Sequence, residues 1–169
     1  MNDTQKASLE IFLAGALLAD KVGILKSALL SGGAVQENWA LDLQVNGGAH
    51  DGVLNTVLRC DSPTAGVAIS HGRAQEFALL RTVFKAGVSV PQPLCLCTDE
   101  TVFGRPFFLM QRIAGTAAGH VLVKNANYAP DRVELARRLG RELARIHSVT
   151  PPVEALDFLP TYSESPAQY

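Results

Sequence analysis

The sequence contains little cysteine, and its pattern excludes a disulfide framework. Only three cysteines occur in 169 residues, Cys60, Cys95 and Cys97, an odd number among apolar neighbours. Cys95 and Cys97 stand too close together for a zinc knuckle, and no second ligand pair follows them. We therefore interpret both as buried strand residues and expect a reducing, cytoplasmic compartment.

The sequence also lacks an excess of either charge and a long hydrophobic run. The formal net charge is -1, so any anion site must be local, and we expect no nucleic-acid partner. No apolar run is long enough to span a membrane, and we expect no membrane partner. Residues 11–19 are apolar, but the acidic Asp3 and Glu10 precede them, which favours a packed N-terminal helix over a signal peptide.

What is present predicts a globular α+β domain, since 47% of the residues are hydrophobic and 18% are charged. A helix is expected over residues 5–20, and an apolar strand over 24–30. From Trp39 to Asn46, apolar and polar residues alternate, which indicates a strand with one buried face. Asn46-Gly47-Gly48 signals a turn, and residues 53–60 form the next strand.

The second half predicts one inserted helix and two more strands. The helix covers about 72–86, and the strands cover 94–98 and 106–113. A further helix is expected over 131–147, followed by a proline-containing tail that is loose or needs a partner to fold on. The fold class is therefore α+β, a five-stranded antiparallel sheet with one inserted helix, flanked by an N-terminal and a C-terminal helix.

Glu76 is the first residue that indicates chemistry. With about 100° per residue, Glu76 falls near the middle of the apolar stripe of its helix. An unpaired carboxylate there costs several kcal/mol, so a cationic partner is expected on the surface that the helix packs against. Arg59, near the end of the third strand among apolar neighbours, is the natural candidate. An ion pair without any ligand remains the alternative interpretation of these two residues.

A glycine-containing turn precedes the second strand. Ser31-Gly32-Gly33-Ala34 exposes backbone N–H groups that can turn toward an anion. Alone this turn is weak evidence, because glycine hairpins are common. Beside Arg59 and Glu76 it completes a set suited to phosphate: a covering loop, a cation, and a carboxylate that orients the cation.

These features resemble the N-lobe of the aminoglycoside phosphotransferase (choline kinase-like) family, which shares the protein kinase fold. The resemblance extends over roughly residues 24–150. It is carried by six stretches in the family's order: 30–39, 57–59, 75–81, 87–93, 104–115 and 139–147. The last of these looks like the first helix of the family's C-lobe, so the resemblance implies an N-lobe over 1–115 and, over 116–169, the segment after the hinge and the first C-lobe helix.

The resemblance also implies roles. Arg59 matches the position at which many relatives carry a phosphate-binding lysine, and Glu76 matches the glutamate that holds it. Residues 31–38 match the loop over the nucleotide. The backbone of Gln111 to Ile113 matches the hinge that binds adenine, with Met110 as the gatekeeper-like residue. ATP and Mg²⁺ are the implied cofactors, and a small-molecule hydroxyl is the implied acceptor.

The catalytic residues of such an enzyme are not found. Phosphoryl transfer needs a carboxylate for the acceptor hydroxyl and side chains that hold magnesium. His147-Ser148-Val149 does not fit the His-x-Asp loop of relatives, and Asp157-Phe158-Leu159 lacks the glycine of the kinase metal motif. We therefore expect the rest of the C-lobe, with the magnesium ligands, to lie outside this chain. The chain alone is then inactive, and the exposed lobe face predicts self-association.

Two other function classes stay open. A non-catalytic nucleotide-binding or protein-interaction module is favoured if the natural gene stops after codon 169, and an enzyme is favoured if a catalytic loop is encoded downstream. A purely structural α+β domain is favoured if the complete protein binds neither ATP nor ADP. The acceptor itself stays open among aminoglycoside, choline, homoserine, sugar and hydroxyacyl thioester.

Overall fold

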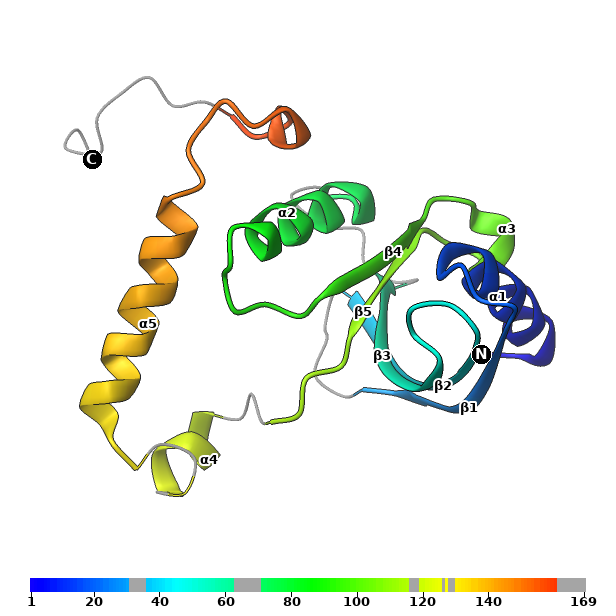
Figure 1. Ribbon diagram of the computed structural model, residues 1–169, viewed down its shortest axis with the longest axis horizontal. Coiled ribbons are helices and arrows are strands. Elements are labelled where there is room, and N and C mark those ends of the chain that lie inside the picture. The colour runs from blue at the N-terminus through cyan, green and yellow to red at the C-terminus, as the bar shows by residue number, and fades with distance from the viewer. Residues whose placement is uncertain (31–35, 63–70, 116–118, 126, 128–129, 161–169) are drawn as a thin grey trace.

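The computed structural model describes residues 1–30, 36–62, 71–115, 119–125, 127 and 130–160 (Figure 1). Its strands are β1 Lys21–Leu29, β2 Gln36–Asn46, β3 Gly52–Asp61, β4 Pro93–Cys97 and β5 Phe107–Gln111. Its helices are α1 Asp3–Ala16, α2 Arg73–Lys85, α3 Glu100–Phe103, α4 Gly119–Lys124 and α5 Arg132–His147, with a 3-10 turn at Glu154–Leu156. The predicted α+β fold is confirmed.

The five strands form one antiparallel sheet in the order β1-β2-β3-β5-β4. β1 to β3 follow one another along the chain, as predicted, because the turn at Asn46 to Gly48 folds β2 back onto β3. Both glycines of this turn have positive φ. At Gly48 a Cβ would lie 2.5 Å from the carbonyl oxygen of Leu18, so the turn has no room for a side chain there.

The N-terminal helix begins and ends earlier than the predicted 5–20. It begins at Asp3 because Asn2 caps it, accepting a hydrogen bond from the Gln5 N–H while the Gln5 side chain accepts from the Asn2 N–H. It ends at Ala16, and Leu18 has a positive φ of 53°. The N–H of Asp20 then donates to the carbonyl of Asn46. This bond places the next residue, Lys21, opposite Asn46 as the first residue of β1. Sheet pairing thus overrides helix propensity here.

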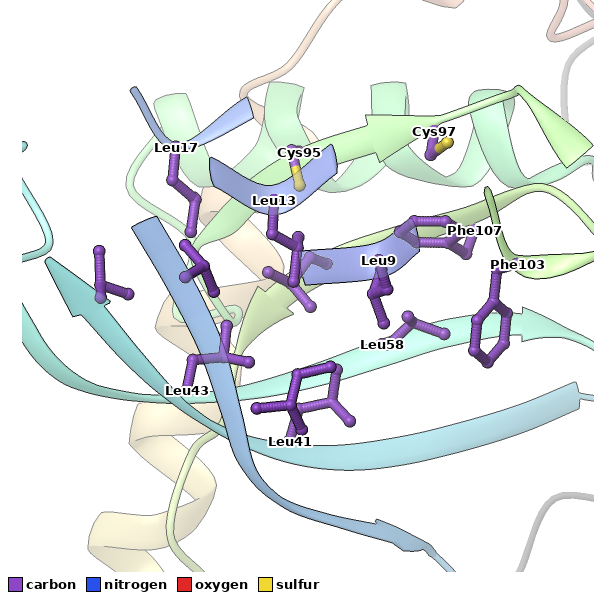
Figure 2. Packing of buried hydrophobic residues seen from close by; sticks show 14 of the residues in the cluster. Leu9, Leu13, Leu17, Leu41, Leu43, Leu58, Cys95, Cys97, Phe103 and Phe107 are labelled. Atoms are coloured by element: carbon purple, nitrogen blue, oxygen red, sulfur yellow. The ribbon is translucent and has the colours of Figure 1, made fainter. Parts of the chain in front are cut away.

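The hydrophobic core lies between α1 and one face of the sheet. Leu9 and Leu13 of α1 are fully buried and point toward Leu41, Leu43 and Leu58 of the strands (Figure 2). Trp39 is partly buried and packs edge-on against Phe103, as expected of a core residue. Phe103 also accounts for the unpredicted helix α3. That helix is capped by Asp99 and places this ring, 2% exposed, in the core.

α2 lies on the opposite face of the sheet from α1 (Figure 1). Side chains alternate between faces along each strand, so Leu41 and Leu58 face α1 whereas Ala40 and Arg59 face the other way. α2 covers this second face over β3, β5 and β4, where Phe77 packs on Phe108 with the ring centroids 5.8 Å apart. The second face is therefore the one on which the predicted phosphate-binding residues meet.

α5 stands beside the sheet domain rather than against it (Figure 1). Asp131 caps its N-terminus, as the sequence predicts.

α5 is tied to the chain after α2 through Glu142. The N–H and the hydroxyl of Ser89 both donate to the Glu142 carboxylate, at 2.8 Å each, and these hydrogen bonds lower the pKa of Glu142. Several large apolar side chains of α5 are 36–62% exposed: Val133, Leu135, Leu139, Leu143 and Ile146. The predicted self-association stays a prediction, as does the division of the chain at residue 115.

The described part of the tail, up to residue 160, packs against α2. The turn Glu154–Leu156 contacts α2, and the Phe158 ring packs edge-on against His71 at 5.4 Å. Of the two predicted alternatives, a loose segment or one that folds on a partner, the contacts with α2 favour the second for residues 154–158. Among the helices of the described residues, none combines the length and the apolarity needed to cross a membrane.

The packing of α1 predicts unequal effects of two substitutions in that helix. Leu13→Ala removes a fully buried side chain and should lower the free energy of unfolding by about 2–5 kcal/mol. Ile11→Ala removes a side chain that is 77% exposed and should change it by less than about 0.5 kcal/mol. Urea unfolding of the two variants measures the difference, and similar small effects would show that α1 is not part of the core.

Burial also predicts inert thiols. All three cysteines are free and buried, and burial raises the pKa of Cys60 to about 11 and that of Cys95 to about 12. Iodoacetamide reacts with the thiolate, so labelling of the folded protein at pH 8 should be at least about 10-fold slower than labelling in urea. Mass spectrometry follows both reactions. Equal rates in the two states would contradict the placement of these residues.

Candidate functional site

The predicted ion pair between Arg59 and Glu76 is present. Arg59 lies on β3, beside Asn38 of β2 and Phe108 of β5, and Glu76 lies in the first turn of α2. Arg59 Nε donates to Glu76 Oε1 over 2.8 Å, and Arg59 Nη1 donates to the side-chain oxygen of Asn38 over 3.2 Å. The helix wheel predicts a buried pair, but the two side chains are 24% and 28% exposed, so the pair is only half-buried. Water or a ligand can therefore reach it.

A second arginine holds the other oxygen of the same carboxylate, and sequence reasoning missed it. Arg73 Nη1 donates to Glu76 Oε2, and its Nη2 donates to the carbonyl of His71 over 2.9 Å. Its Nε lies 3.1 Å from Asp61 Oδ1, an ion pair without the alignment of a hydrogen bond. Arg73 is only 2% exposed. The available signal was its spacing, three residues before Glu76 on one helix, which places the two side chains next to each other.

The charged residues continue along the same end of β2 and β3. Arg105 donates to the backbone carbonyl of Asp61 over 2.8 Å and to Glu37 over 3.0 Å. The cluster thus contains three arginines and three carboxylates: Arg59, Arg73, Arg105, Glu37, Asp61 and Glu76. Each arginine has an acidic partner, so the cluster is balanced in the absence of an anion, and its exposed members are the ones that can exchange partners.

Small apolar residues follow Arg59 along the sheet face toward α2. Val57 is two residues from Arg59 on β3, and it pairs with Ala40 on one side and with Met110 on the other. Ala40 and Val57 are 9% and 8% exposed, and neither extends far from the sheet. The alternation of β2 and β3 could have identified both, but only Met110 was singled out from the sequence. The three are therefore neighbours on the sheet face toward α2, next to the charged end.

The predicted hinge follows Met110. The Gln111 N–H donates to the carbonyl of Gln92, and the Arg112 N–H donates to the carbonyl of Asn55. The Arg112 side chain also donates to Asp42 over 2.6 Å and to Asn55 over 2.8 Å, which fixes this segment to β2 and β3. Two backbone donors of the hinge are therefore already used. Ile113, which is 61% exposed, is the next residue along the chain.

The remaining predicted site residues lie elsewhere or are not described. Ser31, Gly32, Gly33 and Ala34 fall outside the described residues, so the predicted phosphate loop stays a prediction. Within the described ranges there is no group of three or more His, Cys, Asp or Glu side chains that could hold a metal ion. Phe158 of the Asp157-Phe158-Leu159 stretch packs on His71, and the view that this stretch resembles a metal motif by chance stays a prediction.

The shared carboxylate predicts a measurable cost when it is neutralised. Glu76→Gln leaves Arg59 and the buried Arg73 without a charged partner on α2, and should lower the free energy of unfolding by about 1–3 kcal/mol. Glu134 on α5 also meets two arginines, at 3.8 and 2.6 Å, but on the surface. Glu134→Gln is the matched control and should change stability by less than about 0.5 kcal/mol. Equal effects in urea unfolding would show that the Glu76 cluster is an ordinary surface pair.

Comparison with known proteins agrees with the resemblance. Curated relatives include mouse (Mus musculus) acyl-CoA dehydrogenase family member 10, 33% identical over 92 residues, which are 52% of this chain and 8% of that protein. The probable acyl-CoA dehydrogenase IBR3 of Arabidopsis thaliana is 34% identical over 94 residues, or 54% of this chain and 11% of the relative. Human (Homo sapiens) acyl-CoA dehydrogenase family member 11 is 27% identical over 93 residues, or 55% and 12%.

The matches thus cover only 8–12% of the length of each of these relatives, which are much longer proteins than this chain. A broader match comes from the profile of the phosphotransferase enzyme family, which matches residues 45–168. That range contains β3, α2, β4, β5 and α5, and hence Arg59, Arg73, Glu76 and Met110. Because this match includes most of the chain and the whole Arg59–Glu76 site, the chain belongs to the phosphotransferase enzyme family.

Proposed function

We propose that the complete protein transfers a phosphoryl group from ATP to a hydroxyl of a small molecule, and that this chain supplies its ATP-binding half. The observation that carries the proposal is the half-buried Arg59–Glu76 pair, which is followed along the same sheet face by Val57 and Met110 and then by the hinge. A nucleotide needs this sequence of environments: cationic donors for the phosphates, an apolar surface for the base, and backbone groups for its polar edge.

Arg59 would meet the phosphates. A guanidinium has five N–H donors, and the described contacts to Glu76 and Asn38 use two of them. The others are available to a phosphate oxygen without loss of the ion pair. A planar guanidinium can bind two phosphate oxygens side by side, which suits an arginine at a position where many relatives of the family carry lysine.

Adenine would lie against Ala40, Val57 and Met110. Since the N–H groups of Gln111 and Arg112 already donate to the carbonyls of Gln92 and Asn55, the base would have to use the Ile113 N–H and the hinge carbonyls. The resemblance implies that the whole backbone of 111–113 binds adenine, whereas this proposal excludes the N–H groups of residues 111 and 112. The small side chains of Ala40 and Val57 keep this part of the sheet low, and larger residues at these positions would stand in the way of a ring.

Magnesium does not fit the described residues, because they contain no cluster of carboxylates able to bind it. We therefore assign no step to the metal in this half. The metal ligands and the carboxylate that orients the acceptor hydroxyl would come from the C-lobe. On this proposal the 169-residue chain does not catalyse the reaction alone, although it carries the groups that hold the nucleotide.

The names of the relatives suggest which acceptor to test first. They are called acyl-CoA dehydrogenases, and a protein that handles acyl thioesters would encounter hydroxyacyl thioesters. We propose a hydroxyacyl thioester as the first acceptor to assay with the complete protein, with choline, homoserine, a sugar and an aminoglycoside as the comparison set. A product phosphorylated on the hydroxyl, detected by mass spectrometry, identifies the acceptor class.

Arg59→Ala tests the proposed nucleotide site. In the complete protein this substitution should abolish ATP binding measured by calorimetry, because it removes the cation that meets the phosphates. Arg81→Ala is the matched control, since Arg81 is an exposed arginine on α2, and its ATP affinity should stay within about 2-fold of the unsubstituted protein.

Unchanged ATP affinity in Arg59→Ala would overturn the assignment of Arg59. ATP binding without phosphoryl transfer to any acceptor would favour the alternative, a non-catalytic nucleotide-binding module. Absence of ATP and ADP binding in the unsubstituted complete protein would leave only a structural or interaction role.

A further inference from the structure

We infer that Arg73 is a positioning residue for the phosphate-binding arginine, acting through Glu76; the inference rests on the proposed function. The Glu76 carboxylate accepts from Arg59 at one oxygen and from Arg73 at the other. A carboxylate held at a single oxygen can rotate and release its partner. Held at both oxygens, it presents Oε1 to Arg59 in one fixed direction.

Arg73 is well placed to hold the carboxylate still. It is 2% exposed, its Nη2 donates to the carbonyl of His71, and its Nε forms an ion pair with Asp61 at the end of β3. These contacts join the segment before α2 to the strand that carries Arg59. Arg59 itself is 24% exposed and is free to meet a ligand. The buried Arg73 thus fixes the orientation of the Glu76 carboxylate, and Glu76 in turn fixes the orientation of the more exposed Arg59.

Arg73 also changes the local charge. An Arg59–Glu76 pair alone is neutral and attracts a phosphate only weakly, whereas two guanidinium groups around one carboxylate carry a net positive charge. Asp61 offsets this charge, but its side chain is 48% exposed, compared with 28% for Glu76, so water screens it more. The third arginine, Arg105, has its own partner in Glu37. With Asp61 included the group is neutral overall, so its attraction for a phosphate rests on the unused N–H donors that the fixed Arg59 presents.

The test compares ATP with adenosine, because adenosine has the same base and sugar but no phosphate. Dissociation constants of both ligands are measured by calorimetry for the complete protein and for Arg73→Gln, Arg73→Lys and the control Arg81→Gln. Arg73→Gln should weaken ATP binding by about 10-fold or more and adenosine binding by less than about 2-fold. Arg73→Lys should give an intermediate loss for ATP, because lysine keeps the charge but cannot reach Glu76, Asp61 and His71 together. Arg81→Gln should change neither ligand.

Each outcome decides between the hypotheses. If the unsubstituted complete protein does not bind ATP, the proposed function fails and this inference fails with it. If it binds ATP and Arg73→Gln loses affinity for ATP and adenosine equally, or for neither, Arg73 has only a structural role, while the proposed function stands. If circular dichroism shows that Arg73→Gln is unfolded, Arg73→Lys carries the test, and an unchanged ratio of the two dissociation constants in that variant overturns the inference.

Discussion

The site depends on one carboxylate that is shared between two arginines. Glu76 joins α2 to β3 through Arg59 and is itself held in place by the buried Arg73. Removing either arginine would leave the other pair, but removing the carboxylate would leave two cations facing each other, one of them almost fully desolvated. The position of α2 relative to the sheet and the direction of the Arg59 side chain are therefore fixed by the same contact.

The two faces of the sheet carry different kinds of side chain. The face under α1 carries the large buried side chains, including Leu41, Leu58 and Phe107, and supplies most of the apolar burial (Figure 2). The face toward α2 carries Ala40 and Val57 between two polar ends, Arg59 with Glu76 at one and Arg112 with Asp42 at the other. Because strand side chains alternate, one strand can serve stability and binding at once. Leu58 and Arg59 are neighbours in sequence and point to opposite sides.

The sequence was sufficient for the fold class, the strand order along the chain and the Arg59–Glu76 contact, because these follow from periodicity. It did not predict that the pair is half-buried, because a helix wheel shows the direction of the Glu76 side chain but not how closely α2 covers β3 around it. The spacing of Arg73 and Glu76 could have indicated their contact, but the contact of Arg73 with Asp61 could not be foreseen, because it depends on how α2 packs against the end of β3. The end of α1 was wrong because the bond from Asp20 to Asn46 is a long-range one, and α3 is too short, at four residues, to show a period.

A structure of the complete protein bound to a non-hydrolysable ATP analogue tests the central claim most directly. The account predicts phosphate oxygens within hydrogen-bond distance of the Arg59 guanidinium, with Glu76 still joined to both Arg59 and Arg73, and the adenine ring against Ala40 and Val57. A nucleotide bound elsewhere, or bound with Arg59 turned away from the phosphates, would contradict it.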